Sequence, residues 1–269
     1  MIHDAQVHDH PESYAPLFRV WYKVLQPIVA KRSSAILTVS DYSRSRLIDR
    51  QIVRGCNTHV IHNGVDHKVD PLTNNTQPTI SYSRARPFVV VFGSAHRHKN
   101  LSVVFSAFSS DELKEVDLLV VGSVDENQFR DLGVGISANI HFVGRQSDEE
   151  LNELLSSAIC MVFPSLTEGF GLPPLEAMKA GCRVIASPCG AIPEICQKHV
   201  LYADPNSIQE WIDAINFLAR EGEREKADRV KVAKEHANTF TWSSAAGKLA
   251  EILLAIYGNP CLEKHKVGN

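Results

Sequence analysis

The sequence predicts an α/β protein built mainly around a doubly wound parallel β-sheet, and two patterns support this prediction. From residue 87 onward, short apolar segments of strand length alternate with segments whose apolar residues recur every three or four positions, as on one face of a helix. The strand segments are continuously apolar, which is typical of strands covered on both faces. Such a sheet lies between two layers of helices and binds its ligand beyond the carboxyl ends of its strands.

A smaller region, residues 1–70, precedes this sheet and mixes short apolar segments with basic helical ones. Its helices are predicted at residues 13–32 and 41–52, and its strands at 34–40 and 58–66. The second helix begins after Ser40 or at Asp41, because such side chains accept hydrogen bonds from the free N–H groups of a first helical turn. Residues 1–70 therefore form a partial N-terminal domain.

Residues 71–86 are polar, contain proline and have no apolar period, so we interpret them as a linker. The C-terminal domain then covers residues 87–257, and residues 258–269 form a tail. Its strands are predicted at 87–94, 116–123, 139–145, 159–165, 183–188 and 199–204, and its helices at 99–110, 126–132, 147–158, 172–181, 191–197 and over most of 207–257. Ser147 and Glu150 have the spacing of a capping box, which marks a helix start.

The composition excludes several classes of protein. The chain has 269 residues, of which 44% are hydrophobic and 22% charged, as in ordinary globular proteins. The formal net charge of −3 provides no basic field for nucleic acid, so we expect no nucleic-acid partner. The six cysteines form no C-x-x-C pair and are interpreted as reduced thiols of a cytoplasmic protein. The first residues do not resemble a signal peptide, and no segment has the length and apolarity of a transmembrane helix.

Polar residues follow the first strand of the C-terminal domain. Gly93 and Ser94 come directly after the strand, and Arg97 and Lys99 lie in the same turn before a helix. A small residue lets a ligand approach the backbone, and the two cations could reach a phosphate. The turn is neither a G-x-G-x-x-G motif nor a P-loop, so a solvated basic turn remains the alternative interpretation.

A second polar segment follows the strand that ends near Pro164. Gly169 and Gly171 precede a helix that opens with prolines, which suit a first turn because its N–H groups have no partners in the helix. Those N–H groups favour an anion in the loop. Glu168 and Glu176 flank the turn. Taken singly, they could be a solvated loop residue and a dipole-stabilising residue; together they suit a sugar nucleotide, whose hydroxyls donate to carboxylates.

The stretch from Glu168 to Glu176, EGFGLPPLE, resembles the Glu-x7-Glu signature of the retaining glycosyltransferases of family 4, which have the two-domain GT-B fold. The surrounding segments are similar too, notably VFGSAHRHKNL, LLVVGS, NIHFVGRQSDEELNELLSSAICMVFPS and the late FTWSSAA. So are IHDAQVHDHPESYAPLFRVWYKVL, LTVSDYSRSRL and VIHNGVD near the front. The resemblance covers nearly the whole chain. It implies a Rossmann-like C-terminal donor domain behind a partial Rossmann-like N-terminal domain for the acceptor.

The resemblance implies a role for each matching residue of the donor side. Glu176 would bind the ribose hydroxyls of the nucleotide, and Glu168 would face the hydroxyls of the transferred sugar. The backbone N–H groups of Phe170, Gly171 and Leu172 would bind that sugar and its phosphate.

Other matching residues surround these. Arg97 and Lys99 would neutralise the departing diphosphate, beside Gly93 and Ser94 of the same turn; the family often has Arg where this chain has Ser94. His3 would be the acceptor-side histidine, and Gly144 and Arg145 would lie along the loop that passes the base.

The resemblance implies transfer of a hexosyl unit, with retention, from a nucleoside diphosphate sugar to a saccharide or lipid-linked acceptor. The segment around HPE and PLFRVWYKVL is most similar to bacterial mannosyltransferases of surface polysaccharide assembly, which favours GDP-mannose over UDP-sugars. Two alternatives remain: a fragment that binds the nucleotide sugar without transferring it, and a sugar-nucleotide epimerase of the same fold.

No metal or other cofactor is expected, because the chain contains no D-x-D pair to hold a divalent ion on a diphosphate. The alternative is a zinc site on the first residues, formed by His3, Asp4, His8, Asp9 and His10.

Residues 14–32 suggest a contact with the inner face of the plasma membrane. Arg19, Lys23, Lys31 and Arg32 lie on this helix together with Trp21 and Tyr22, as in helices that rest on anionic lipid. The alternative is that its aromatic face packs within the N-terminal domain.

The resemblance also implies further acceptor-domain strands before residue 2 in a complete enzyme. We therefore expect residues 80–257 to fold stably and bind the donor, and residues 1–70 to be less protected, with His3 close to a fraying end. Sugar transfer is expected to be slow or absent unless those strands are restored.

Overall fold

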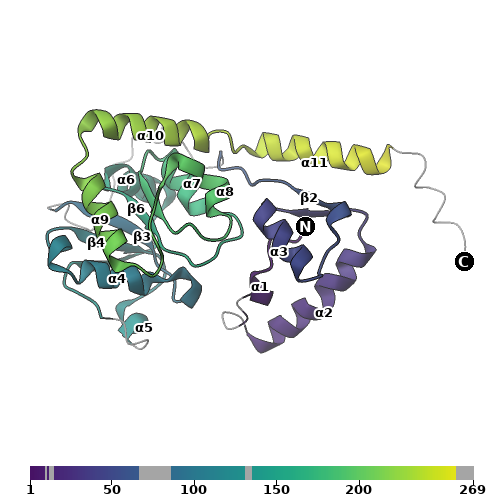
Figure 1. Cartoon of the computed structure of the whole chain (residues 1–269), viewed down its shortest axis with the longest axis horizontal. Coiled ribbons are helices and arrows are strands. Elements are labelled where there is room, and N and C mark those ends of the chain that lie inside the picture. The colour runs from purple at the N-terminus through teal and green to yellow at the C-terminus, as the bar shows by residue number, and fades with distance from the viewer. Residues whose placement is uncertain (10, 12–14, 67–85, 131–134, 259–269) are drawn as a thin grey trace, which may run out of the picture.

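The computed structural model describes residues 1–9, 11, 15–66, 86–130 and 135–258. Two units lie side by side, an N-terminal unit of residues 1–66 and a C-terminal unit of residues 86–241 (Figure 1). Of the predicted linker 71–86 only Arg86 is described, and of the predicted tail 258–269 only Gly258; the rest lies outside the described residues.

The C-terminal unit is built on a six-stranded sheet in which every neighbouring pair is parallel. Its strands are β3 (Phe88–Phe92), β4 (Asp117–Val121), β5 (Ile140–Gly144), β6 (Met161–Phe163), β7 (Val184–Ala186) and β8 (Leu201–Tyr202). They lie in the order β5-β4-β3-β6-β7-β8, so the direction of winding reverses between β3 and β6. This confirms the predicted doubly wound sheet and places its ligand-binding point at the ends of those two strands.

Helices cover both faces of the sheet, as the continuously apolar strands predict. One core joins Val90, Leu119 and Met161 to α6 (Asp148–Ser157), α7 (Leu172–Lys179), α8 (Ile192–Cys196) and α10 (Glu223–Ala237). The other joins Val89, Leu118 and Val162 to α4 (Leu101–Phe108), α5 (Glu126–Arg130) and α9 (Ile208–Ala219). Successive strand residues thus enter opposite cores, because side chains alternate across a strand.

Local capping explains where several helices begin. The Ser147 hydroxyl accepts from Glu150 N–H while the Glu150 carboxylate accepts from Ser147 N–H, which confirms the predicted capping box. The helix expected from residue 99 begins later. A 3₁₀ turn, Arg97–Lys99, comes first, and Asn100 then adopts a left-handed conformation with φ of 53°. Two further 3₁₀ turns lie in this unit, at Asp111–Leu113 and Gln197–His199.

The N-terminal unit is smaller and has a thin core. It contains α1 (Gln6–Asp9), α2 (Pro16–Arg32), β1 (Ile36–Thr38), α3 (Asp41–Asp49), a 3₁₀ turn (Gly55–Asn57) and β2 (Thr58–Val60). β1 and β2 form a parallel pair, and a few apolar side chains such as Leu47 pack beneath them. Ser40 caps α3 by accepting from Ser43 N–H, as predicted.

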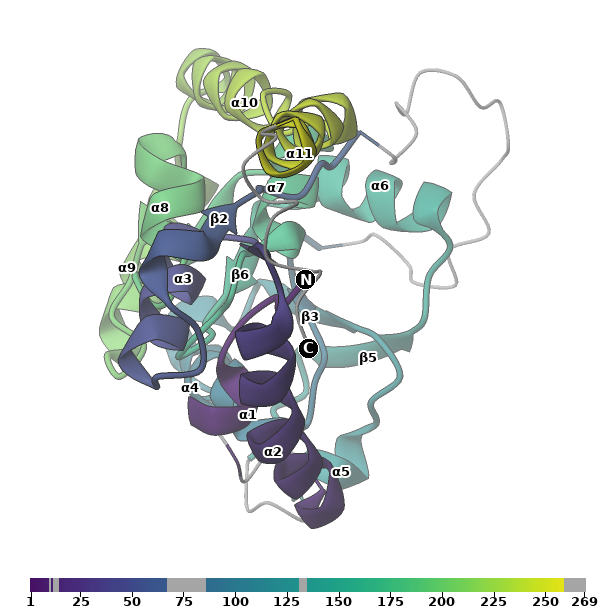
Figure 2. The same ribbon diagram turned by 90° about the vertical axis from the view of Figure 1, so that its right-hand side faces the viewer.

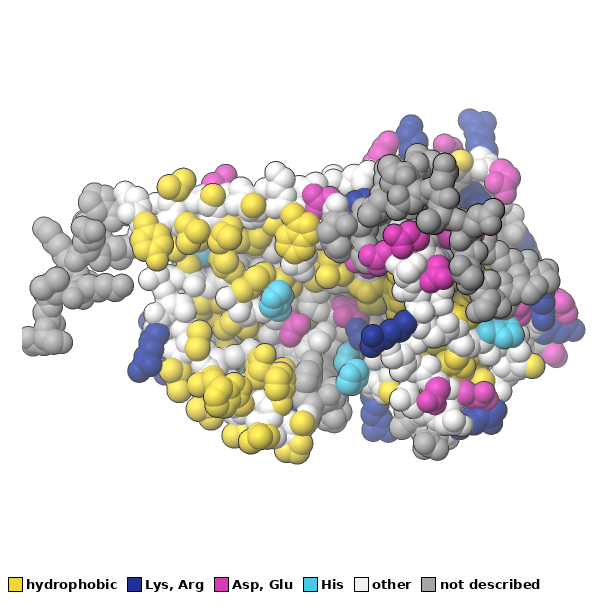
Figure 3. Space-filling view, turned by 180° about the vertical axis from the view of Figure 1, so that it is seen from behind, with side chains coloured by type: hydrophobic (Ala, Val, Ile, Leu, Met, Phe, Trp, Pro, Cys, Tyr) yellow, Lys and Arg dark blue, Asp and Glu magenta, His cyan; other side chains and the backbone are white. Residues whose placement is uncertain are grey.

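The aromatic face of α2 packs only partly within this unit: Tyr22 and Leu25 are half-buried and line a cavity together with Ile2 and Val7. Among the α2 side chains only Ala30 is buried, and the Trp21 side chain is 63% exposed. The N-terminal unit has too few helices and strands to cover the apolar face of α2 completely. Figure 3 shows apolar side chains over this unit, and those exposed on α2 are Leu17, Phe18, Val20, Trp21, Val24, Ile28 and Val29.

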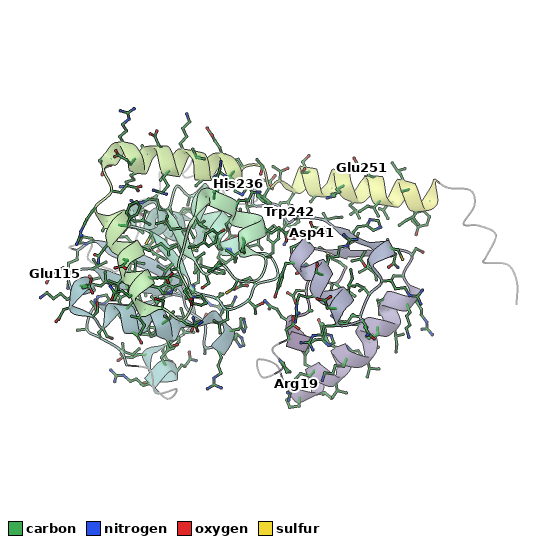
Figure 4. All side chains as sticks on the ribbon, in the orientation of Figure 1. Arg19, Asp41, Glu115, His236, Trp242 and Glu251 are labelled. Atoms are coloured by element: carbon green, nitrogen blue, oxygen red, sulfur yellow. The ribbon has the colours of Figure 1, made fainter. Side chains whose placement is uncertain are left out.

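The last helix, α11 (Trp242–Tyr257), leaves the C-terminal unit and extends along the N-terminal one (Figures 1 and 2). Trp242 lies where α10 gives way to α11 (Figure 4). At this junction Val65 N–H donates to Phe240 O over 2.9 Å, and Trp242 N–H donates to an Asp66 carboxylate oxygen over 2.8 Å. In the part of the chain that the structure describes, no helix is both long and apolar enough to cross a membrane.

Candidate functional site

The candidate site lies where the carboxyl ends of β3 and β6 meet, at the point where the winding of the sheet reverses. Gly93 directly follows β3, and its backbone packs so closely on β4 that a Cβ atom there would lie 2.9 Å from Val120 Cγ1 on that strand. Ser94 is half-buried, and its hydroxyl accepts a long hydrogen bond from His96 N–H at 3.4 Å. The turn after β3 is therefore pressed against the neighbouring strand.

The two loops that carry the site residues are tied to each other. His98, in the turn after β3, is buried, and its carbonyl accepts from Leu166 N–H in the loop after β6 at 2.7 Å. Arg97, one residue earlier, is exposed, whereas Lys99, one residue later, is partly buried and points to the second loop. The structure thus separates the two cations of this turn, of which only Lys99 points to the second loop.

Lys99 and Glu168 form an ion pair across the site. Lys99 Nζ donates to Glu168 Oε1 over 2.7 Å, and the exposed fractions of the two side chains are 28% and 10%. The pair explains how a nearly buried carboxylate is tolerated, because an unpaired charge there would be destabilising. Sequence reasoning placed both residues in the site but did not predict that they bind each other.

The loop from Glu168 to Leu172 leads into α7 and presents its backbone to the site. Gly171 is the N-cap of α7 with φ of 109°, a conformation that strongly favours glycine. The first N–H groups of a helix have no acceptor inside it, so they and the helix dipole favour an anion. Glu176 is half-buried and lies one turn after Leu172 on the same face of α7.

Gly144 and Arg145 lie farther away, at the end of β5, two strands from β3. Gly144 has φ of 73°, and no atom lies within 4 Å of the place where its Cβ would be. Arg145 is exposed, and its guanidinium donates to the Ser123 hydroxyl after β4. These two residues border the site rather than joining the Lys99–Glu168 cluster.

The first residues of the chain reach the site from the other unit. Ile2 is buried, its N–H donates to Leu37 O over 2.8 Å, and His3 O accepts from the Thr38 hydroxyl over 2.8 Å. The backbone at His3 is therefore bonded to β1 and its flank, although the structure assigns no strand there. Whether this end frays in solution stays a prediction.

Asp4 is a site residue that sequence reasoning considered only as a zinc ligand. A Cβ atom on Gly169 would lie 2.8 Å from both Asp4 Cβ and Asp4 Oδ2, so the two segments touch. Burial raises the pKa of the Asp4 carboxyl. A hydrogen bond from Gln6 N–H and the electrostatic influence of His3 and Lys99 lower this pKa, but they do not outweigh burial. Two carboxyl groups, from Asp4 and Glu168, thus lie near Lys99. Only spatial proximity, which the sequence does not display, could have revealed this.

The zinc alternative finds no support among the described residues, where no group of three or more His, Cys, Asp and Glu side chains is placed to hold a metal. The Asp9 carboxylate is bonded to Arg46 and Arg50, and His8 Nε2 lies 2.6 Å from Gln26 Oε1. His10 lies outside the described residues. That no metal is required stays a prediction.

Further bonds join the two units beside the site. The Glu194 carboxylate, on α8, accepts from Asp41 N–H and Tyr42 N–H at the start of α3, each over 2.9 Å, and lies 3.4 Å from His62 Nε2. Figure 4 labels Asp41 at the end of α3 nearest the C-terminal unit. Partial burial raises the pKa of Glu194, but the bonds from His62 and the two N–H groups outweigh it, so the pKa lies below its ordinary value.

Comparison with known proteins places this geometry in a family. Residues 79–236 match the family described as "Glycosyl transferases group 1", and residues 1–69 match "Glycosyltransferase Family 4". The chain is 31% identical over 254 residues to the MMP α-(1→4)-mannosyltransferase of Mycolicibacterium hassiacum, an alignment that covers 88% of this chain and 58% of that protein. It is 26% identical over 222 residues to the O-antigen chain mannosyltransferase RfbU of Salmonella typhimurium, covering 81% of this chain and 59% of the relative.

The chain thus spans less than two thirds of the length of these relatives. Solved structures share its fold. Sucrose-phosphate synthase from Thermosynechococcus elongatus superposes with a TM-score of 0.73 at 20% identity, covering 94% of this chain and 65% of that one. Anabaena HepE in complex with UDP-glucose gives a TM-score of 0.70 at 21% identity, covering 91% and 69%. These likenesses confirm the GT-B type of fold, and the family match covers more than half of the sequence: the chain belongs to the group 1 glycosyl transferases.

Proposed function

We propose that the protein is a retaining hexosyltransferase whose donor is a nucleoside diphosphate sugar. The observation that supports this best is the meeting of Lys99, Glu168 and the start of α7 at the reversal point of the sheet. A diphosphate needs cations and N–H groups, and a sugar needs carboxylate acceptors; this cluster offers all three within one loop system.

In the proposed reaction the bond between the sugar's anomeric carbon and the diphosphate breaks, and a bond to an acceptor hydroxyl forms on the same face. The diphosphate leaves with the electron pair of the broken bond, and the acceptor hydroxyl gives its proton to an oxygen of the departing diphosphate. Lys99 and Arg97 would stabilise the negative charge that develops on the diphosphate. Glu168 would orient the sugar hydroxyls, and Glu176 would bind the ribose. His3 would lie on the acceptor side, because its neighbour Asp4 contacts Gly169 and so brings His3 towards the loop.

The donor and acceptor are proposed from relatives and from the sequence. GDP-mannose is favoured because the relatives named above include mannosyltransferases, whereas UDP-sugars are the alternative because the HepE structure holds UDP-glucose. A saccharide or a lipid-linked saccharide is the proposed acceptor, in surface polysaccharide or glycan assembly. A cytoplasmic location and the absence of a metal requirement belong to the same proposal.

A peripheral membrane contact through α2 is part of this proposal. Val20, Trp21 and Val24 are more than half exposed, and Lys23 and Lys31 are exposed on the same helix. An apolar surface beside cations is the pattern of a helix that rests on anionic lipid. Contact with such a surface would bring a lipid-linked acceptor to the enzyme.

Ligand binding tests the proposal first. A ligand present at 100 times its dissociation constant stabilises the folded state by about 2.7 kcal/mol, so a thermal-shift panel of GDP-, UDP- and ADP-sugars should show which donor binds. Turnover with acceptor saccharides then separates the three candidate activities. Transfer releases free nucleoside diphosphate and extends the acceptor, epimerisation converts the sugar nucleotide without releasing diphosphate, and a binding fragment does neither. Absence of any thermal shift across the panel would contradict the donor assignment.

A further inference from the structure

The carbonyl oxygen of Gly169, in the middle of the donor-side loop, is held by two hydroxyl groups from the other unit. Ser40 Oγ donates to it over 2.6 Å and Ser43 Oγ over 2.9 Å, and both serines are completely buried. Ser43 lies 126 positions from Gly169 in the sequence. Two buried donors on one carbonyl fix its direction more firmly than a single bond could.

Fixing this carbonyl also fixes the N–H group of Phe170. A trans peptide unit is planar, so Gly169 C=O and Phe170 N–H point in opposite directions from the same plane. With the carbonyl pointing to the serines of the N-terminal unit, Phe170 N–H points away from them. Among the described residues no acceptor is bonded to this N–H group, so it is available to a ligand.

The neighbouring atoms restrain the same peptide from other sides. The Phe170 ring is buried, with its centroid 5.9 Å from that of His62 and 6.1 Å from that of Phe240. Asp4 occupies the place where a side chain on residue 169 would lie. Behind the loop, Glu168 O accepts from Ala191 N–H over 2.9 Å. The loop is thus held in one conformation by residues of both units.

We infer that Ser40 and Ser43 are positioning residues for the sugar part of the donor: through Gly169 they aim the Phe170 N–H group at the bound sugar. The inference rests on the proposed function. The N-terminal unit thereby contributes to donor recognition as well as to acceptor binding. The serines act on the sugar and not on the nucleotide, because the diphosphate cations and Glu176 belong wholly to the C-terminal unit.

Ser43→Ala is the cleanest variant for the test. Among the described residues the Ser43 hydroxyl donates only to Gly169, and alanine is well accepted inside a helix, whereas Ser40 also caps α3. Thr58→Val is the matched control, because the Thr58 hydroxyl is likewise buried in the N-terminal unit and bonded to a carbonyl, that of Arg54, over 2.7 Å. Ser43→Thr restores a hydroxyl at the same position.

Two measurements decide the inference. Calorimetry compares each variant's affinity for GDP-mannose with that for GDP, and for UDP-glucose with that for UDP. Loss of one buried hydrogen bond in Ser43→Ala should reduce the ratio of the affinity for the sugar nucleotide to that for the diphosphate by about three- to tenfold. The affinity for the diphosphate itself should stay within about twofold of the parent's. Hydrogen exchange of the 166–172 segment, measured without ligand, should rise about fivefold. Thr58→Val should change neither quantity, and Ser43→Thr should restore both.

The exchange measurement keeps this test separate from that of the function. If the parent protein binds no sugar nucleotide better than its diphosphate, the proposed function loses its support, and the sugar-positioning role falls with it whatever the exchange shows. If the parent does bind the sugar but Ser43→Ala leaves both the affinity ratio and the exchange unchanged, the inference alone is overturned. A faster exchange with an unchanged ratio would reduce the serines to a purely structural contact, and would overturn it as well.

Discussion

Lys99 Nζ lies 2.7 Å from Glu168 Oε1, so the cation that the proposed function assigns to the diphosphate is already bonded to the carboxylate that it assigns to the sugar. The two residues come from the turns after β3 and β6, the neighbouring strands at which the sheet reverses. A bound diphosphate must therefore compete with Glu168 for the positive charge of Lys99. Changes at the two positions should for this reason have opposite effects on nucleotide binding.

Lys99→Ala should weaken binding of a nucleoside diphosphate by about 1.5–3 kcal/mol, the range for hydrogen bonds to charged groups. Glu168→Gln should strengthen binding of the same diphosphate by about 1 kcal/mol, because the positive charge of Lys99 is no longer neutralised, and should remove the preference for the sugar nucleotide. Isothermal calorimetry measures both. Lys231→Ala, at an exposed position on α10, is the control and should behave like the parent. Equal effects of one sign at Lys99 and Glu168 would contradict the assignment.

Glu176→Ala should weaken the nucleoside diphosphate and the sugar nucleotide equally, by about 1.5–3 kcal/mol, because a ribose contact is common to both ligands. The measurement is the same calorimetric pair of titrations. Glu251→Ala, on α11 far from the sheet, is the matched control (Figure 4). A loss confined to the sugar nucleotide would move Glu176 from the ribose to the sugar.

The contact of Glu194 with α3 should depend on pH. The folded-state pKa of Glu194 lies below its ordinary value of 4.5, so its stabilising contribution is fully present above that value and disappears as the pH falls through the lowered folded pKa. Glu194→Gln should therefore lower stability by about 1–2 kcal/mol at pH 7, and the difference from the parent should shrink in acid. Urea unfolding at both pH values measures this.

Glu235→Gln, at an exposed position of α10, controls for the general effect of acid. A difference between the parent and Glu194→Gln that is the same at pH 7 and in acid would show that the charge of Glu194 does not hold the two units together.

The exposed face of α2 should bind anionic vesicles at low salt and release them as salt is added. Lys23→Glu should weaken co-sedimentation with phosphatidylglycerol vesicles by about 1 kcal/mol or more, since a basic residue near such a surface contributes about that much. Trp21→Ala should weaken it at every salt concentration, because burial of apolar area is not screened. Lys231→Glu is the control. Failure of the parent protein to co-sediment at low salt would remove the membrane contact.

The sequence predicted those parts of the fold that depend on residues close together in the chain. The alternation of strands and helices follows from apolar periodicity, and the caps at Ser40 and Ser147 follow from side chains that bond within one turn. The short helix α1 was not predicted, because four residues hold little periodic signal. The packing of α2 could be predicted only in part, because periodicity reports that a face is apolar but not how much of it another element covers.

The sequence pointed to residues that the structure brings together, namely Lys99 and Glu168, but it did not predict their contacts. Lys99, Glu168 and Glu176 stood out from their place after strands and in a short motif, and the resemblance to a family then implied a role for each. The bonds of Ser43 to Gly169 and of Glu194 to Asp41 join positions more than a hundred residues apart, and neither partner carries a local signal of the other. Asp4 was missed as a neighbour of Gly169 for the same reason.

The chain passes from one unit to the other twice, and both passages lie side by side. It leaves the N-terminal unit after Asp66 and returns along it after Thr241, and the bonds from Val65 to Phe240 and from Trp242 to Asp66 tie the outgoing and returning segments together. The units are also joined at Gly169, by Ser40 and Ser43, and at Glu194, by Asp41, so a swing about these segments must break those bonds. We therefore expect the bonds at Gly169 and Glu194 to break first when the units separate, while Val65, Asp66, Phe240 and Trp242 act as the hinge.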